Sequence, residues 1–323
     1  MKYLIINILV FLVSAVITIY FVPIVRKIGL KLNFFDKPNE RKHHKKPLVR
    51  IGGLALILGF YFAIIFIFFT FDDYSKIFNT NYNYISLLIL AFLIFSLGFI
   101  DDIFDLTPLS RLSFQLIIAF IASRNGLNFS GLEFSSIWNI IYVFTIPLLL
   151  TNIISIVWLS GVTNAFNWLD GLDGLAAGVG IISSLSISIY NLRLDNIIVS
   201  LLAAALAGAC LGFLKYNFKN ASILMGDGGS YFIGFNIAGL TLMSYQQNSR
   251  VLEIIPLILF IALPLFDMST VIIGRILNKK SPFKPDRSHL HHRLLEFGIS
   301  GKSTVLIIYA LSLFTSLLGL FIF

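Results

Sequence analysis

The sequence contains little charge and almost no cysteine. Only 12% of its 323 residues are Asp, Glu, Lys or Arg, whereas soluble domains carry roughly 25%. Its single cysteine, Cys210, lies in an apolar run; it excludes an intramolecular disulfide and is predicted to be a small core residue. Because 57% of the residues are hydrophobic, this scarcity of charge excludes an ordinary soluble protein and indicates a polytopic membrane protein.

The positive charge that is present is unevenly distributed. The net charge of +8 comes mostly from two loops, so it gives little support to a nucleic-acid partner. Basic loops beside membrane spans orient a protein in the bilayer and contact anionic lipids or phosphates. We therefore predict contact with membrane lipid and no nucleic acid.

Long apolar runs predict the fold class. A membrane-spanning helix needs about 20 mainly apolar residues, and the N-terminal run is too long for a typical signal peptide. There is no internal repeat and no linker, so we expect one integral-membrane domain over residues 1–323. We predict an all-α bundle of about ten transmembrane helices, near residues 3–22, 51–71, 84–100, 111–123, 147–166, 174–191, 196–214, 230–245, 253–276 and 303–322.

The basic residues predict the orientation of this bundle. Of the 24 Lys and Arg residues, all but Lys2, Lys76, Arg124, Arg193 and Arg250 fall in one set of alternate loops. Cytoplasmic loops carry the excess of Lys and Arg, so we place this set in the cytoplasm and both termini outside. Every polar cluster described below falls on the same predicted cytoplasmic face.

Two carboxylates and two amides lie between apolar segments in the stretch NAFNWLDGLDGLA, residues 164–176. Asp170 and Asp173 are three residues apart, which would put both on one face of a helix, and the glycine after each acid permits close approach of a ligand. Acids beside a membrane span are costly and usually functional. A helix cap explains one Asp, but a cap alone does not explain both acids together with Asn164 and Asn167.

Three further acids and an arginine lie at predicted cytoplasmic ends of spans. Asp101 and Asp102 are adjacent, and because adjacent carboxylates repel, a nearby cation or a shared proton is expected. Asp227 lies between glycines in the stretch GDGG, which leave room for a metal and a phosphate. Mg²⁺ suits a few carboxylates completed by water or phosphate oxygens. The alternative for Asp101 and Asp102 is a charged end of a span, and the alternative for Asp227 is a simple turn. Arg111, at the start of the next predicted span, would either reach an anionic ligand or anchor its helix.

The first basic loop, residues 36–53, reads DKPNERKHHKKPLVRIGG. For most of its lysines, membrane orientation is a sufficient explanation. Its prolines and glycines indicate a shaped turn, and cations such as Lys42, together with His44, would attract an anionic headgroup.

The last basic loop contains three histidines, His289, His291 and His292, beside Arg287 and Arg293. Three histidines could form a zinc site. The flanking arginines instead favour a phosphate, and a solvated basic loop is the remaining alternative.

Two other features concern structure more than chemistry. Asp267 lies within an apolar stretch, where a polar contact between helices explains it at least as well as a catalytic role. The outside segment 124–146 alternates weakly and contains Gly and Asn, which predicts a short hairpin.

Five stretches together resemble a known family. They are DKPNERKHHKKPLVRIGG, LGFIDDIFDL, NAFNWLDGLDGLAAG, GDGGSYFIG and PDRSHLHHRL, spread in this order from residue 36 to residue 294. In sequence and order they resemble the polyprenyl-phosphate N-acetylhexosamine-1-phosphate transferases of glycosyl transferase family 4. The RKHH and HLHH arrangements are more similar to the branch that uses UDP-GlcNAc than to the branch that uses UDP-MurNAc-pentapeptide.

The resemblance implies a reaction and a set of site residues. It implies transfer of GlcNAc 1-phosphate from UDP-GlcNAc to undecaprenyl phosphate, with release of UMP, at the start of lipid-linked cell-surface polysaccharide synthesis. It also implies a homodimer in the bacterial inner (plasma) membrane with a cytoplasmic active site. It implies catalytic roles for Asp101, Asp102, Asp170 and Asp173, a Mg²⁺ ligand in Asp227 (with Mn²⁺ as a substitute), and substrate-binding roles for Asn164, Asn167, Arg111, His289, His291, His292, Arg287, Lys42 and His44.

Alternative functions and mechanisms make different predictions. The same chemistry with UDP-MurNAc-pentapeptide or another UDP-N-acetylhexosamine would preserve the site. A cation- or proton-coupled transporter would place acids near span midpoints and show repeat symmetry, which this sequence does not. Direct attack of the lipid phosphate and a covalent aspartyl-phosphate route both remain open mechanisms.

Overall fold

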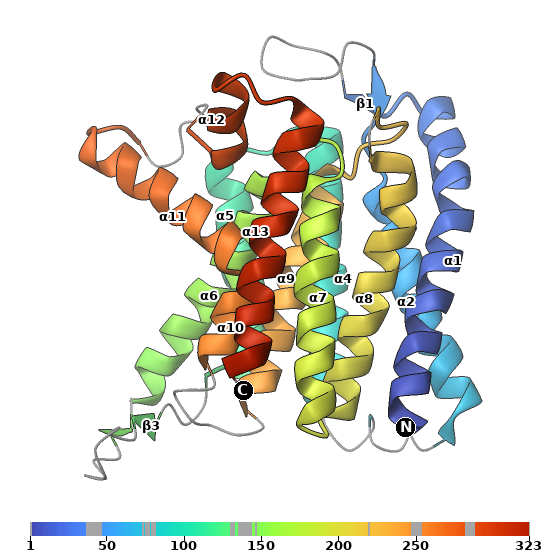
Figure 1. Cartoon of the computed structure of the whole chain (residues 1–323), viewed down its shortest axis with the longest axis vertical. Coiled ribbons are helices and arrows are strands. Elements are labelled where there is room, and N and C mark those ends of the chain that lie inside the picture. Colours follow the sequence, from blue (N-terminus) through green and yellow to red (C-terminus); the bar gives the residue numbers. More distant parts are fainter. Residues whose placement is uncertain are drawn as a thin grey trace.

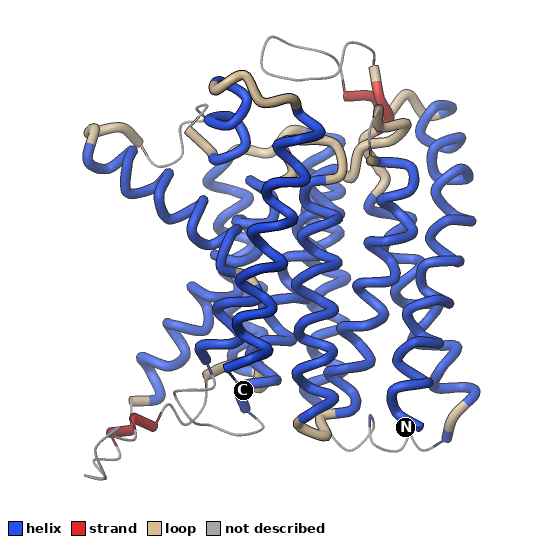
Figure 2. Tube along the Cα trace, viewed as in Figure 1, coloured by secondary structure: helices blue, strands red, loops and turns tan. Residues whose placement is uncertain are grey.

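The computed structural model describes residues 2–36, 47–72, 74, 78, 82–129, 133–134, 144–145, 147–218, 220–246, 254–281 and 288–322. Most of these residues are helical (Figure 2). The helices are α1 (Lys2–Lys31), α2 (Gly53–Thr70), α4 (Tyr82–Phe104), α5 (Pro108–Arg124), α6 (Leu148–Leu169), α7 (Leu175–Arg193), α8 (Ile197–Asn217), α9 (Gly226–Gln246), α10 (Ile254–Phe260), α11 (Ala262–Leu277), α12 (Leu290–Glu296) and α13 (Gly301–Ile322). The strands are β1 (Phe35–Asp36), β2 (Leu48–Val49), β3 (Glu133–Phe134) and β4 (Phe144–Thr145).

The lengths and apolar composition of the helices confirm an all-α polytopic membrane protein. Within the described residues, α1, α2, α4, α6, α7, α8 and α13 could each cross a membrane, and the pair α10–α11 would make an eighth span. The stretches expected near 111–123 and 230–245 do form helices, α5 and α9. However, α5 has only 17 residues and α9 contains many glycine and polar residues. The total of about ten spans therefore stays a prediction.

One expected helix is not continuous. The single helix predicted near residues 253–276 is two helices, α10 and α11, which meet at 78°. Pro264 has no backbone N–H and cannot donate to the carbonyl of Phe260, four residues earlier. The hydroxyl of Ser183 donates to that carbonyl at 2.7 Å, so the break leaves no unsatisfied group there. After the bend, α11 packs against α6 and α13, and its C-terminal end projects outward from the bundle (Figure 1).

Helix α9 forms the centre of the bundle. Nearly all of its side chains are buried, and it packs against α4, α6, α2 and α7. Helix α4 approaches its first turn closely at Gly98, where a Cβ atom would lie 2.6 Å from the carbonyl carbon of Asp227. This close approach brings the end of α4 that carries Asp101 and Asp102 against the first turn of α9.

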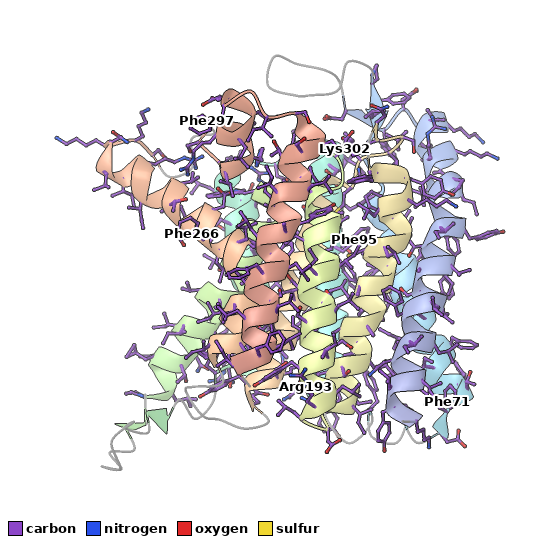
Figure 3. All side chains as sticks on the ribbon, in the orientation of Figure 1. Phe71, Phe95, Arg193, Phe266, Phe297 and Lys302 are labelled. Carbon is purple, nitrogen blue, oxygen red and sulfur yellow. The ribbon has the colours of Figure 1, made fainter. Side chains whose placement is uncertain are left out.

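The two ends of the bundle differ in what they carry. In Figure 1 both termini lie at the end opposite β1 and α12. Figure 3 places Lys302 toward the α12 end and Arg193 toward the termini. These two residues belong to opposite loop sets in the Lys and Arg distribution, so the fold is consistent with the expected alternation of loops. Which end faces the cytoplasm stays a prediction.

Two short hairpins connect helices: β1 and β2 lie between α1 and α2, and β3 and β4 lie between α5 and α6. Strands β1 and β2 pair antiparallel, with Asp36 opposite Leu48, and they flank the part of the first basic loop that lies outside the described residues. Strands β3 and β4 also pair antiparallel, with Glu133 opposite Thr145. The hairpin predicted within segment 124–146 is therefore confirmed, although α5 occupies its first residue.

Candidate active site

The acids predicted from the sequence converge at one end of the bundle. Asp101 and Asp102 lie in the last turn of α4, Asp170 follows α6 directly, and Asp227 lies in the first turn of α9. Of these four acids, Asp170 and Asp227 line a cavity of about 590 Å³. Five of the predicted site residues line this cavity: Asn167, Asp170, Asp173, Asp227 and His292.

Asp102 closes the N-terminus of α9. Its carboxylate accepts hydrogen bonds from the backbone N–H of Asp227 at 2.8 Å and of Gly228 at 3.1 Å. The Nε of Arg50 lies 2.9 Å from the same carboxylate, whose side chain is only 2% exposed. A buried carboxylate at a helix N-terminus satisfies free N–H groups and interacts favourably with the helix dipole. The geometry therefore gives Asp102 a clear structural role.

Asp101 has different partners from its neighbour. Its Oδ2 lies 2.9 Å from Nη1 of Arg111, and its Oδ1 accepts a hydrogen bond from the backbone N–H of Leu106 at 2.8 Å. Each of the two adjacent acids therefore has its own cation nearby: Asp101 has Arg111, and Asp102 has Arg50.

Asp227 lies between these two arginines. Its Oδ2 is 3.1 Å from Nη2 of Arg50 and 3.6 Å from Nη1 of Arg111. Its Oδ1 accepts a hydrogen bond from Nδ2 of Asn167 at 2.8 Å, and Asn167 also donates to Ser230. Burial alone would lower the pKa of Arg50, but the carboxylates of Asp227, Asp102 and Asp36 raise it, so its guanidinium stays charged.

Asp170 is the unpaired acid of the site. In the described part of the chain its carboxylate has no hydrogen bond or ion pair, and it lines the cavity together with Asp227. Burial and then the negative charges of Asp227 and Asp102 raise the pKa of Asp170 well above the usual value for an aspartate. A carboxylate held near like charges attracts a cation or a proton.

Asp173 and Asn164 are placed differently from Asp170. Asp173 accepts a hydrogen bond from the backbone N–H of Ala221 at 2.9 Å, which ties its turn to the segment before α9. Asn164 donates to Oε1 of Gln115 and to the carbonyl of Ser160. It is not among the described residues that line the cavity, so the structure does not bring it to the site.

The histidines follow one another around the start of α12. His289 contacts Asp267, with 2.9 Å between Nδ1 and Oδ2, and Asp267 also accepts from the backbone N–H of Leu290 at 2.7 Å. The contact between helices expected for Asp267 is thus confirmed. His291 is buried against Gly171, where a Cβ atom would lie 2.3 Å from Nε2, and His292 lines the cavity. The predicted residues Arg287, Lys42 and His44 lie outside the described residues.

Several residues of the site were not predicted as such from the sequence. Arg50 contacts two of the acids, and the cavity is also lined by Asn217, Phe218, Leu224 and Lys302. The glycines after Arg50 and the hairpin before it were a usable signal, since they bring its backbone close to Gly226. The other residues carry no such signal, because their positions depend on the packing of α8 and α13.

The oxygen donors of the site fit Mg²⁺. Among the described residues, no group of three or more His, Cys, Asp or Glu side chains is arranged to hold a metal ion. Mg²⁺ does not require such a group, because it is usually bound through one or two carboxylates and completes its coordination with water and substrate phosphates. The unpaired carboxylate of Asp170 and the adjacent Asp227 provide that kind of donor set.

Comparison with known proteins assigns this arrangement to a family. Residues 84–245 match the model of glycosyl transferase family 4. The chain belongs to glycosyl transferase family 4. The matched residues include all five site acids of α4, the 170–173 turn and α9: Asp101, Asp102, Asp170, Asp173 and Asp227.

Relatives across bacteria extend over nearly the whole chain. A Bacillus subtilis protein named "Probable undecaprenyl-phosphate N-acetylglucosaminyl 1-phosphate transferase" is 34% identical over 95% of this chain and 82% of its own length. A Mycobacterium tuberculosis "Decaprenyl-phosphate N-acetylglucosaminephosphotransferase" is 33% identical over 93% of this chain and 78% of its own length. An Escherichia coli "Undecaprenyl-phosphate alpha-N-acetylglucosaminyl 1-phosphate transferase" is 29% identical over 93% of this chain and 80% of its own length. The similarity to these transferases therefore extends over nearly the whole of this chain and about four fifths of each relative.

Proposed function

We propose that this chain transfers N-acetylglucosamine 1-phosphate from UDP-GlcNAc to undecaprenyl phosphate and releases UMP. The observation that carries the proposal is that Asp227, which contacts both Arg50 and Arg111, lines the same cavity as the unpaired Asp170. Family membership and the names of the relatives support the same reaction. A transporter would need acids along its spans, whereas Asp101, Asp102, Asp170 and Asp227 lie at helix ends.

The reaction requires two anions to approach each other. An oxygen of the lipid phosphate attacks the β-phosphorus of the UDP-sugar, and the bond from that phosphorus to the oxygen shared with UMP breaks. The electron pair of that bond leaves with UMP. Arg50 and Arg111 lower the repulsion between the phosphates, since their guanidinium groups suit phosphate oxygens in charge and geometry.

We assign Asp170 and Asp227 as the residues that would hold Mg²⁺, with Mn²⁺ as a substitute. When bound, Mg²⁺ supplies positive charge that neutralises the diphosphate and the departing UMP. Asn167 orients the Asp227 carboxylate through its 2.8 Å hydrogen bond. Asp101 holds Arg111 in place through the 2.9 Å ion pair.

We assign the nucleoside to the part of the cavity that Phe218, Leu224 and Lys302 line. Phe218 and Leu224 offer apolar contact there, and Lys302 offers a polar group. His292, in α12, also lines the cavity, where it would contact the donor diphosphate. The second pKa of a phosphate monoester is near 6, so a general base contributes little at neutral pH and positioning by these residues matters more.

We further propose that the site faces the cytoplasm of a bacterial inner membrane and that the protein acts as a homodimer. The distribution of Lys and Arg supports the orientation, and the membrane-capable helices support the membrane location.

The test is a transfer assay with purified protein in detergent. Radiolabelled UDP-GlcNAc and undecaprenyl phosphate are supplied with Mg²⁺, Mn²⁺ or EDTA, and label in the lipid phase is measured together with UMP. We expect transfer with either metal, loss of transfer in EDTA, and loss of transfer in Asp227→Asn. Asp195→Asn is the matched control, because Asp195 is exposed and has a left-handed backbone (φ 56°) that Asn adopts readily.

Assays with different UDP-sugars distinguish the alternative substrates and functions. Transfer from UDP-MurNAc-pentapeptide or another UDP-N-acetylhexosamine, without transfer from UDP-GlcNAc, would preserve the chemistry and change the substrate. Failure with every UDP-sugar, in protein that unfolds cooperatively on heating, would contradict the proposed function.

A further inference from the structure

Gly174 is the flexible point of the turn that carries the acids. The turn runs from Asp170 to Gly174, and Gly174 has a left-handed backbone (φ 78°) just before α7 begins. It has no side chain to restrict it, and a Cβ atom would lie 2.9 Å from the ring of Phe218. Glycine loses more conformational freedom on ordering than any other residue, so other groups must hold this turn in place.

Two distant helices hold Gly174 by its backbone. Oδ1 of Asn217, at the end of α8, accepts a hydrogen bond from the Gly174 N–H at 2.9 Å. The hydroxyl of Tyr309, in α13, donates to the Gly174 carbonyl at 2.6 Å. The same carbonyl accepts the first helical hydrogen bond of α7, from Gly178, at 2.9 Å. Both polar backbone groups of the flexible residue are therefore engaged from outside its own turn.

The position of Tyr309 depends on a second glycine. Its ring lies against Gly178, where a Cβ atom would be 2.0 Å from the ring carbon that bears the hydroxyl. Helices α7 and α13 are in contact and lie side by side in Figure 1. Tyr309 is thus seated in a gap that α7 leaves for it, with its hydroxyl directed at the turn.

The same turn is tied to the segment that leads to Asp227. Asp173 accepts from the backbone N–H of Ala221, and Nδ2 of Asn217 donates to the carbonyl of Ile223 at 3.0 Å. Tyr309 completes this set of contacts from the opposite side. Without its hydrogen bond, the turn would keep its contacts with the α8–α9 segment and with His291 but would lose its attachment to α13, so Gly174 could shift.

We propose that Tyr309 is a positioning residue of the site: through the Gly174 carbonyl, its hydroxyl fixes the turn that holds Asp170 opposite Asp227. The inference rests on the proposed function, in which these two carboxylates bind a divalent cation. Tyr309 itself is not among the described residues that line the cavity, so its effect passes through the turn.

The test compares two tyrosine-to-phenylalanine variants. Tyr309→Phe removes only the hydroxyl. Tyr61→Phe is the matched control, because the Tyr61 hydroxyl also donates to a backbone carbonyl, that of Leu88, and is likewise part-buried but lies away from the cavity. Mn²⁺ binding by the detergent-solubilised protein is measured by electron paramagnetic resonance, alongside Tm in EDTA and the kcat and KM of transfer.

We expect Tyr309→Phe to weaken Mn²⁺ binding by roughly three- to tenfold, the factor that corresponds to one neutral hydrogen bond. Its kcat should fall while the KM for undecaprenyl phosphate stays unchanged, and its Tm should fall no further than that of Tyr61→Phe. A purely structural hydroxyl would lower Tm in both variants and leave Mn²⁺ binding unchanged.

The outcomes separate the inference from the proposed function. Wild-type Mn²⁺ affinity and kcat in Tyr309→Phe would overturn the inference even if transfer is demonstrated. Weaker Mn²⁺ binding in Tyr309→Phe alone, in a protein that transfers no sugar phosphate, would support the inference and contradict the function. Absence of Mn²⁺ binding by the wild type would overturn both the metal assignment and the inference.

Discussion

Asp102 caps the helix in which Asp227 lies: its Oδ1 accepts a hydrogen bond from the Asp227 backbone N–H at 2.8 Å. The two acids are 125 residues apart in the sequence, yet one positions the backbone of the other. This relationship gives the two acids different predicted roles, the first in the fold and the second in the chemistry.

We expect Asp102→Asn to destabilise the protein strongly. An amide presents one oxygen and one NH₂ group, so it directs a donor at either the α9 N–H groups or Arg50. Loss of a buried charge-assisted hydrogen bond costs about 1.5–3 kcal/mol, and thermal unfolding in detergent would measure the decrease. Asp227→Asn, whose side chain is 17% exposed, should abolish transfer with a much smaller change in Tm. Equal losses of Tm in the two variants would contradict this division of roles.

We expect Arg50→Lys to impair transfer although it preserves the charge. The guanidinium contacts Asp102 through Nε and Asp227 through Nη2, and one ammonium group cannot reproduce both contacts. The value of kcat/KM should fall at least tenfold, a loss of about 1.4 kcal/mol. Arg26→Lys is the control, because Arg26 lies on the same end of the molecule and makes one exposed hydrogen bond, to the Ser222 carbonyl. Similar kinetics for both variants would argue against a role for Arg50.

We expect Gly171→Ala to displace His291. The added methyl group would lie 2.3 Å from the Nε2 atom of that buried ring, closer than any normal contact, so the turn or the ring must move. Transfer should fall and Tm should decrease by a few degrees, since overpacking costs roughly 1–3 kcal/mol. In Gly274→Ala the new methyl group meets nothing within 4 Å, and helical Gly→Ala changes are favourable by up to about 1 kcal/mol. That variant should retain full activity.

We expect the metal-free protein to lose stability as pH rises, in part through Asp170. Because its folded pKa lies above that of the unfolded chain, near 4, the folded state binds more protons in the interval between the two values. Stability therefore falls as pH increases through that interval. Asp170→Asn removes this contribution, so in EDTA at pH 8 its Tm should be higher than that of the wild type.

With added Mg²⁺, the wild type should have a higher Tm than Asp170→Asn, the reverse of the order expected in EDTA. A ligand that binds only the folded state raises its stability, and only the wild type retains both carboxylates. Thermal unfolding at pH 5 and pH 8, with EDTA or with Mg²⁺, measures all four conditions. An Asp170→Asn protein that is less stable than the wild type in EDTA at pH 8 would contradict the role of Asp170 as an unpaired, destabilising acid.

The class of protein and its family could both be predicted from the order and types of the residues. Apolar runs of sufficient length leave few alternatives to membrane helices, and the Lys and Arg distribution places the acidic and basic motifs on one predicted face. Asp101, Asp170 and Asp227 could be proposed as neighbours for that reason alone. The glycines that follow Asp170 and precede Asp227 also predicted turns at those positions, and the structure has them.

The partner of each polar side chain could not be predicted in this way, because it depends on how the helices pack. Adjacent in sequence, Asp101 and Asp102 have separate arginines, and Asn164 points to Gln115 while Asn167 reaches Asp227. The break at Pro264 and the support that Tyr309 gives to Gly174 likewise depend on partners in other helices. Hydrogen bonds act over about 3 Å and in fixed directions, so they depend on how helices pack, whereas hydrophobic length and charge bias are properties of each segment alone.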